Sequence, residues 1–421
     1  MRIGQKIRFF RKKKGMTLEV LSEAICSVSY LSKTETGKIE ASPEILALLG
    51  KRLGINLIPE ESLVSLNNFR EELYKWYECI ITKNEKAHTM YTLLRKEIQQ
   101  VEAPDLLSSF YLFELRYLLS CGNITESENK LEKLKDIREI FTKEQEYYYN
   151  KFNGLFYYLN RAFKEALNHI NIAEGLLKDC IVEEYERADL YYLKGLATHQ
   201  LYQITASNNY IEQALNFYNK NYNLTRSAEC LILLSINYRR ISDIKNAEHH
   251  LLKALNISRA TSNNTLEGLV CHTLGKLSYQ RENYLESITM HKRALEKFTD
   301  GDDLLRCTYC IALCHYMLEE FNEFYKWKLK GIRTAEKEGN YEQLLHFQLL
   351  NAREYCTEEE FEVLLSEKAI PFFLNKEDWK HTAQFCEELA DFYSEKHKYK
   401  LAAYYYKIAY ESFKNITLIY N

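Results

Sequence analysis

Hydrophobic residues recur at helical spacing through the first part of the chain. Ile3, Ile7 and Phe10 lie at i, i+4 and i+7, so they share one face of a predicted helix. Thr17 precedes a second apolar run and Ser27 precedes a third, and both residue types are favourable N-caps. Four short helices are therefore predicted, over residues 4–14, 18–25, 28–35 and 43–54.

Turn residues separate these helices. Gly15 ends the first helix and Gly37 ends the third, while Ser42 before Pro43 combines an N-cap with proline at the first helical position. Two short helices joined by a tight turn, inside a bundle of about 55 residues, form the layout of a helix-turn-helix.

A second pattern, of small residues, repeats along the remainder of the chain. In four predicted helical hairpins a small residue is followed twelve residues later by a second and seven further by a third: Gly154, Ala166 and Ala173; Ser235, Ala247 and Ala254; Gly275, Ser287 and Ala294; and Ala390, Ala402 and Ala409. The period is near 40 residues. Gly195 and Ala214 are nineteen residues apart, which predicts an insertion near residues 204–209 in that hairpin.

Composition supports an all-α fold. Only 4 prolines and 14 glycines occur in 421 residues, which leaves little material for the turns of a β protein. The charge is divided unequally, because residues 1–58 carry a net +6 and the remainder a net −9. A small basic segment attached to a large acidic one indicates that only the first part meets a polyanion.

Several function classes find no support in the sequence. There is no phosphate-binding glycine loop, HExxH, GxSxG or paired CxxC motif, so neither an enzyme nor a cofactor is predicted. The longest nearly uncharged run, LLRCTYCIALCHYML, is too short to span a bilayer, and no signal peptide is recognisable. The 11 cysteines lack paired spacing, which indicates free thiols in a cytoplasmic protein that does not meet the membrane.

The first 57 residues resemble an XRE/Cro-type DNA-binding domain. The residues that carry the resemblance are Ile7-Arg8, Arg11, Gly15-Met16-Thr17, Leu21-Ser22, Ser29-Tyr30-Leu31-Ser32-Lys33, Glu35, Gly37-Lys38 and Pro43. Two positions depart from the family pattern, because Leu18 replaces a phosphate-contacting glutamine and Ile25 is taken to replace the turn glycine.

The resemblance implies a recognition helix that reads double-stranded DNA in the major groove. The residues expected at base edges are Ser27, Val28, Ser29, Ser32 and Lys33, with Val28 suited to a thymine methyl and Lys33 to guanine. The residues expected at phosphates are Arg8, Arg11, Lys12, Lys13, Lys14, Thr17 and Lys38.

The repeats resemble tetratricopeptide repeats, although the usual tryptophan and terminal proline are missing. The predicted organisation is a helix-turn-helix over residues 1–57, a linker over 58–67 and about seven to nine hairpins over 68–421, stacked into a right-handed solenoid. The whole arrangement is similar to the peptide-sensing regulators of Gram-positive bacteria, the PlcR/NprR/Rgg/PrgX (RRNPP) group. This resemblance implies a cytoplasmic, homodimeric transcription factor that binds a short signalling peptide and a palindromic operator.

Two other functions stay open on the sequence alone. The chain could dock onto a phosphorelay component, as Rap-like members of the group do, or repress phage or plasmid genes without a ligand. For the peptide-binding reading, the inner-face positions of the hairpins give the candidate contacts: Lys151, Tyr158, Tyr192, His199, Arg239, His272, Thr273, Lys276 and Tyr279. Lys151, Arg239 and Lys276 are the expected contacts for a carboxylate, and Thr273 stands where relatives commonly carry an asparagine that holds the peptide backbone.

Three cysteines lie on one face of a predicted helix. Cys307, Cys310 and Cys314 are followed by His315, but one straight helix cannot surround a metal ion, so no metal site is predicted. Buried or groove-lining thiols are the favoured interpretation, and a redox sensor is the alternative.

Overall fold

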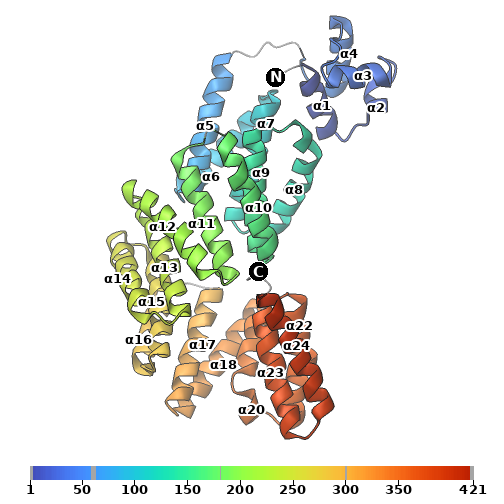
Figure 1. Cartoon of the computed structure of the whole chain (residues 1–421). Coiled ribbons are helices and arrows are strands. Elements are labelled where there is room, and N and C mark those ends of the chain that lie inside the picture. The colour runs from blue at the N-terminus through green and yellow to red at the C-terminus, as the bar shows by residue number, and fades with distance from the viewer. Residues whose placement is uncertain (1–2, 58–62, 181, 299–300, 418–421) are drawn as a thin grey trace. The chain divides into compact units, whose positions relative to one another are not determined.

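The computed structural model describes residues 3–57, 63–180, 182–298 and 301–417. The chain divides into two compact units, one up to Leu193 and one from Lys194 onward. Among the described residues there are helices and no strands (Figure 1), which confirms the all-α prediction. No helix in these ranges combines the length and apolar character that crossing a membrane requires.

The first unit opens with the four predicted helices of the helix-turn-helix. They are α1 (Ile3–Lys13), α2 (Leu18–Ser22), α3 (Val28–Glu35) and α4 (Pro43–Leu53). The predicted caps form, since the side chains of Thr17, Ser27 and Ser42 accept hydrogen bonds from backbone N–H groups three residues later. Gly54 closes α4 in the left-handed conformation, at φ 63°.

The turn between α2 and α3 differs from the prediction. Helix α2 ends at Ser22, not at residue 25, and Ala24 takes the left-handed conformation at φ 54°. The residue that stands in for the turn glycine of the family is therefore Ala24, and the assignment of this role to Ile25 was wrong. A left-handed alanine costs free energy relative to glycine, which the surrounding bundle must offset.

Paired helices fill the rest of the first unit. They are α5 (Leu63–Ile81), α6 (Lys86–Glu97), α7 (Pro104–Ser120), α8 (Ile124–Ile137), α9 (Lys143–Leu159), α10 (Phe163–Leu176) and the start of α11 (Glu184–Gln200), with 3₁₀ turns η1 (Ile98–Gln100), η2 (Arg138–Ile140) and η3 (Leu177–Asp179). Residues 63–67 of the predicted linker belong to α5, and residues 58–62 lie outside the described part of the chain.

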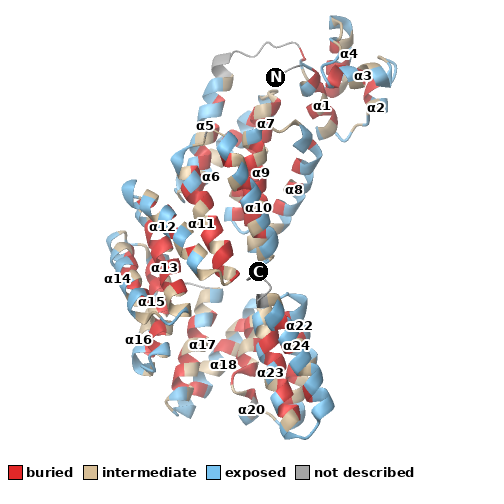
Figure 2. Cartoon of the chain, in the orientation of Figure 1, coloured by how far each residue is buried: buried red, intermediate tan, exposed pale blue. Residues whose placement is uncertain are grey.

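The second unit continues with hairpins of similar length. Its helices are α12 (Ile204–Lys220), α13 (Leu224–Arg240), α14 (Ile244–Ala260), α15 (Asn264–Gln280), α16 (Tyr284–Leu295), α17 (Asp302–Met317), α18 (Phe321–Glu338), α19 (Tyr341–Leu349), α20 (Ala352–Tyr355), α21 (Glu358–Val363), the π-helical η4 (Leu364–Ala369), α22 (Ile370–Asn375), α23 (Trp379–Glu395) and α24 (Tyr399–Thr417). Buried residues line the helix faces that pack together (Figure 2).

The turns of the second unit share a local sequence rule. Left-handed residues recur every twenty positions, at Tyr202, Tyr222, Ser242, Ser262 and Glu282. After the last four of these, an asparagine or aspartate caps the next helix by accepting a backbone N–H bond. The repeat is therefore encoded in its turns as well as in its small residues.

Small residues let the helices of a hairpin approach closely. A Cβ on Gly154 would lie 2.6 Å from Ile170 Cγ1, and one on Gly195 would lie 2.3 Å from Ile211 Cδ1. The insertion predicted near residues 204–209 is absent, because α12 starts at Ile204 directly after a short turn. Ser207, twelve residues after Gly195, takes the expected small position and donates a hydrogen bond of 2.8 Å to the Gly195 carbonyl.

Candidate DNA-binding and peptide-binding sites

Helix α3 presents the predicted recognition residues to solvent. Ser32 is half-buried, and the other four are exposed: Ser27, Val28, Ser29 and Lys33. Leu31, Thr34 and Glu35 face inward. A major-groove reader needs this division between a packed face and an accessible one, and the DNA contacts themselves stay a prediction.

Gly4 of α1 fixes the position of the recognition helix. A Cβ at Gly4 would fall 1.9 Å from the Thr34 carbonyl oxygen, so α1 and α3 touch backbone to backbone. This contact depends on a residue without a side chain.

Arg11 has a structural role instead of the predicted phosphate contact. Its guanidinium donates two hydrogen bonds to Glu35, Nε to Oε1 at 2.6 Å and Nη2 to Oε2 at 2.7 Å, and Nη1 donates to the Met16 carbonyl at 3.0 Å. Both side chains are buried, and the bonds to Glu35 raise the pKa of Arg11. The expectation for Arg11 was therefore wrong, because its donors are already engaged inside the bundle.

The other predicted phosphate contacts fall into two groups. Arg8 and Lys12 on α1 both contact Glu139 in η2, with Lys12 Nζ at 2.9 Å from its carboxylate, and Lys13 Nζ lies 5.5 Å from the centre of the Tyr111 ring. The remaining candidates are exposed, and they are Lys14, Thr17 and Lys38.

Lys151 is buried and paired within the first unit, contrary to the sequence expectation. Its ammonium lies 2.9 Å from Glu186 and 2.8 Å from Asp189, and it donates to the Tyr77 hydroxyl at 3.2 Å. The side chain is completely buried. Lys151 therefore joins α5, α9 and α11, and the prediction that it receives a peptide carboxylate was wrong. Tyr158 and Tyr192 are half-buried in the same unit.

His199 and Thr273 also make internal hydrogen bonds. His199 Nδ1 lies 2.5 Å from the Asn237 side-chain oxygen, and burial lowers the pKa of His199 to about 4, so its imidazole is neutral near pH 7. Thr273 is buried and donates to the Leu269 carbonyl at 2.8 Å, within its own helix. Thr273 therefore does not present its hydroxyl to a ligand, as had been expected.

Arg239 on α13 and Lys276 on α15 form a cationic pair, the Arg239–Lys276 cluster, that faces Cys310 on α17. Both side chains are half-buried, and burial lowers the pKa of each. Arg239 Nε is buried without a hydrogen-bond partner, and in the described residues no carboxylate lies within salt-bridge distance of either cation. Uncompensated, partly desolvated cations are a favourable place for an anionic ligand. Tyr279, also half-buried, lies on the same helix as Lys276.

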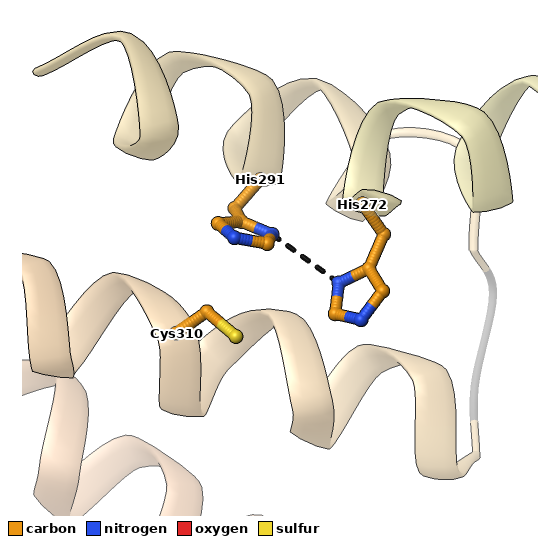
Figure 3. Close-up of side chains that lie close together, drawn as sticks. All are labelled: His272, His291 and Cys310. Carbon is orange, nitrogen blue, oxygen red and sulfur yellow. Dashed lines mark hydrogen bonds between the residues drawn. The ribbon is translucent and has the colours of Figure 1, made fainter. Parts of the chain in front are cut away.

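One functional candidate was missed by sequence reasoning. His291 of α16 lies beside His272 of α15 and close to Cys310 of α17, and a pattern search along a single helix could not bring these three together (Figure 3). The sequence signal was a histidine at a hairpin position where earlier repeats carry isoleucine or leucine.

The chain is similar in sequence to a known domain family and to a transcriptional activator. The helix-turn-helix family matches residues 7–58. The transcriptional activator NprA of Geobacillus stearothermophilus is 34% identical over 409 residues, which are 94% of this chain and 99% of that protein.

Two solved structures have the same fold. NprR in complex with its cognate peptide NprX has a TM-score of 0.67 at 20% identity, covering 82% of this chain and 97% of that one. A Rap protein complexed with competence and sporulation factor has a TM-score of 0.73 at 19% identity, covering 84% of this chain and 99% of that one.

A helix-turn-helix with exposed recognition residues, followed by tetratricopeptide-like hairpins, defines a helical-repeat transcription factor. The alignment with the transcriptional activator NprA covers 94% of this chain and 99% of that protein, so the similarity extends beyond the helix-turn-helix. The chain belongs to the RRNPP family of peptide-sensing transcriptional regulators, as the sequence resemblance predicted.

Proposed function

We propose that the chain regulates transcription as a homodimer, binds a palindromic operator through α3, and binds a short signalling peptide through the Arg239–Lys276 cluster. It has no catalytic role in this proposal and acts in the cytoplasm, where its operator is. The observation that carries the peptide site is the pair of half-buried cations without a carboxylate partner among the described residues.

The cluster suits the carboxylate of a peptide. Arg239 can bind a carboxylate through two parallel N–H bonds, and Lys276 supplies a second positive charge from the neighbouring hairpin. Partial burial strengthens such a bond relative to the same bond in water. The cognate peptide in the NprR structure, which has the same fold, supports a peptide as the ligand.

Calorimetric titration of the full chain tests the peptide site. The probes are short synthetic peptides taken from the C-terminal ends of small secreted reading frames beside the gene, each with a free or an amidated C-terminus. Arg239→Gln and Lys276→Gln should each weaken binding by about tenfold or more, since a charge-assisted hydrogen bond contributes about 1.5–3 kcal/mol. If the partner is the terminal carboxylate, amidation reproduces the loss; if it is an acidic side chain, replacing that residue by its amide does so.

A matched control uses a cation of the same unit that already has a partner. Arg281→Gln removes a guanidinium that pairs with Glu248 at 2.6 Å on an exposed surface, so it should leave peptide affinity unchanged. Tight binding that Arg239→Gln and Lys276→Gln both leave intact would move the peptide site elsewhere.

A further inference from the structure

Three potential metal ligands converge from three successive helices of the second unit. His272 lies on α15, His291 on α16 and Cys310 on α17, and their ligand atoms all lie within 4.8 Å of one another. Figure 3 shows both imidazoles and the Cys310 sulfur turned toward one shared space. The convergence that one straight helix cannot supply comes from the packing of neighbouring hairpins.

His291 occupies a position that packing alone would fill with an apolar side chain. Sixteen residues after Gly154, Gly195 and Ser235, the small residues of the three preceding hairpins, stand Ile170, Ile211 and Leu251, all buried. In this hairpin Gly275 makes room for the imidazole, because a Cβ there would lie 2.6 Å from His291 Nε2. That nitrogen is buried without a hydrogen-bond partner. This Nε2 lies against Gly275, and the other ring nitrogen, Nδ1, is the one that faces His272. Burial of an imidazole costs more free energy than burial of leucine, so packing alone does not account for histidine at this position.

The separation of the two imidazoles matches metal coordination. A hydrogen bond of 3.2 Å joins His272 Nδ1 and His291 Nδ1 (Figure 3). Two nitrogens on one tetrahedral ion, at bond lengths of about 2.0–2.1 Å, would be about 3.3 Å apart, so an ion could replace the shared proton with little movement of the rings. An imidazole binds a metal ion through a nitrogen lone pair, so each ring can supply one ligand.

The positive charges near the three ligands favour a metal ion of lower charge. Lys276 and Arg239 are close enough to influence Cys310 and His272, and a divalent ion with a single thiolate would leave a net positive charge beside them. A monovalent ion with the same thiolate is neutral. Imidazole and thiolate together suit Cu⁺ and Zn²⁺.

We propose that His272, His291 and Cys310 form a binding site for a thiophilic metal ion, with Cu⁺ preferred over Zn²⁺. The ion bonds to one nitrogen of each imidazole and to the Cys310 sulfur, and the thiol proton leaves to solvent. Cys307, whose sulfur lies 3.2 Å from His272 Nδ1, is next to this trio but is not one of the proposed ligands. The site belongs to the second unit alone and does not depend on the peptide proposal.

Metal titration of the reduced, metal-stripped full chain tests the proposal without any peptide. Cu⁺ and Zn²⁺ are each titrated in competition with a chromophoric chelator, and we expect one ion per chain, bound more tightly for Cu⁺. Cys310→Ser and His291→Leu should each lower affinity by at least tenfold, because even loss of a residue that only supports a metal ligand costs about 10–100-fold. His291→Leu restores the residue type of the earlier hairpins, so folding should persist and can be checked by circular dichroism.

A control variant and a second metal show whether any loss of affinity is specific to the three proposed ligands. Cys271→Ala removes a buried thiol from the same helix as His272 but outside the trio, and it should leave the affinity unchanged. Co²⁺ gives a second reading, because thiolate ligation produces a charge-transfer absorption that Cys310→Ser should abolish. Equal metal affinity in the unmodified chain, Cys310→Ser and His291→Leu would overturn the site, and a preference for Zn²⁺ would overturn the charge argument.

Discussion

At the scale of single residues, burial separates side chains that hold the bundle together from those free to bind DNA. Arg11 and Lys33 both belong to the motif that identified the domain, yet Arg11 is engaged by Glu35 whereas Lys33 is exposed on α3. The motif therefore contains both structural and exposed residues, and the burial of each side chain decides whether it stabilises the bundle or is accessible to DNA. Specificity should therefore come from α3 and general affinity from the exposed cations around it.

Substitution of two lysines tests this division. Lys33→Ala should relax sequence preference at one operator position, because an amino group that reaches a base edge discriminates by about 1–3 kcal/mol. Lys38→Ala should weaken all DNA sequences to a similar extent and lower the salt dependence by about one ion. Fluorescence anisotropy against operator variants at several salt concentrations measures both. Identical effects of the two substitutions would count against α3 as the reader.

At the scale of elements, buried charges join helices that belong to different hairpins. Lys151 of α9 contacts Glu186 and Asp189 of α11 and the Tyr77 hydroxyl of α5, all out of reach of water. Such a group fixes the register of the helices because each charge requires its partners, and removal of one member leaves the others buried and uncompensated.

Lys151→Met should therefore destabilise the first unit by about 3–5 kcal/mol, the usual cost of breaking a buried ion pair from one side. Lys143→Met is the control, because Lys143 pairs with Asp179 on the surface, and exposed pairs contribute about 0–1 kcal/mol. Chemical denaturation of both variants, followed by hydrogen exchange in α9 and α11, gives the comparison. Similar losses from the two substitutions would show that the buried group does not hold these helices.

At the scale of the whole molecule, the palindromic operator proposed above would require two copies of the chain. Helix α24 at the end of the second unit carries Tyr399, Tyr406 and Tyr410 on one face, and these side chains are 63%, 41% and 68% exposed. An exposed aromatic face on a helix of a repeat array is a suitable surface for a second copy.

Tyr410→Arg should shift the proposed dimer toward monomer and reduce the affinity for a two-half-site operator, because it places a positive charge on the aromatic face of α24. Analytical ultracentrifugation measures the oligomeric state. Tyr222→Arg is the control, since Tyr222 is 86% exposed but lies in a turn between hairpins. A dimer of unchanged stability in the Tyr410→Arg variant would place the interface on another surface.

Local rules in the sequence determined the elements of this protein. The N-caps at Thr17, Ser27 and Ser42 and the helical spacing of apolar residues depend on neighbours a few positions away, so they could be read from the chain directly. The hairpins followed from the spacing of small residues for the same reason. Two predictions were wrong in detail: the left-handed turn residue is Ala24, not Ile25, and the small residue after Gly195 is Ser207, with no insertion before it. In both cases the helices themselves were correctly predicted and only the position within them was wrong.

Tertiary packing alone decided which charged and polar side chains are available. Lys151 and Lys276 were both predicted on the inner face of their hairpins, but two acidic residues of the next hairpin neutralise the first, while in the described residues the second faces another cation. Likewise, His291 is a candidate metal ligand only because the fold brings it close to His272 and Cys310, which are distant in sequence. The free energy of a charge depends on everything within a few ångströms of it, and those neighbours are chosen by the fold.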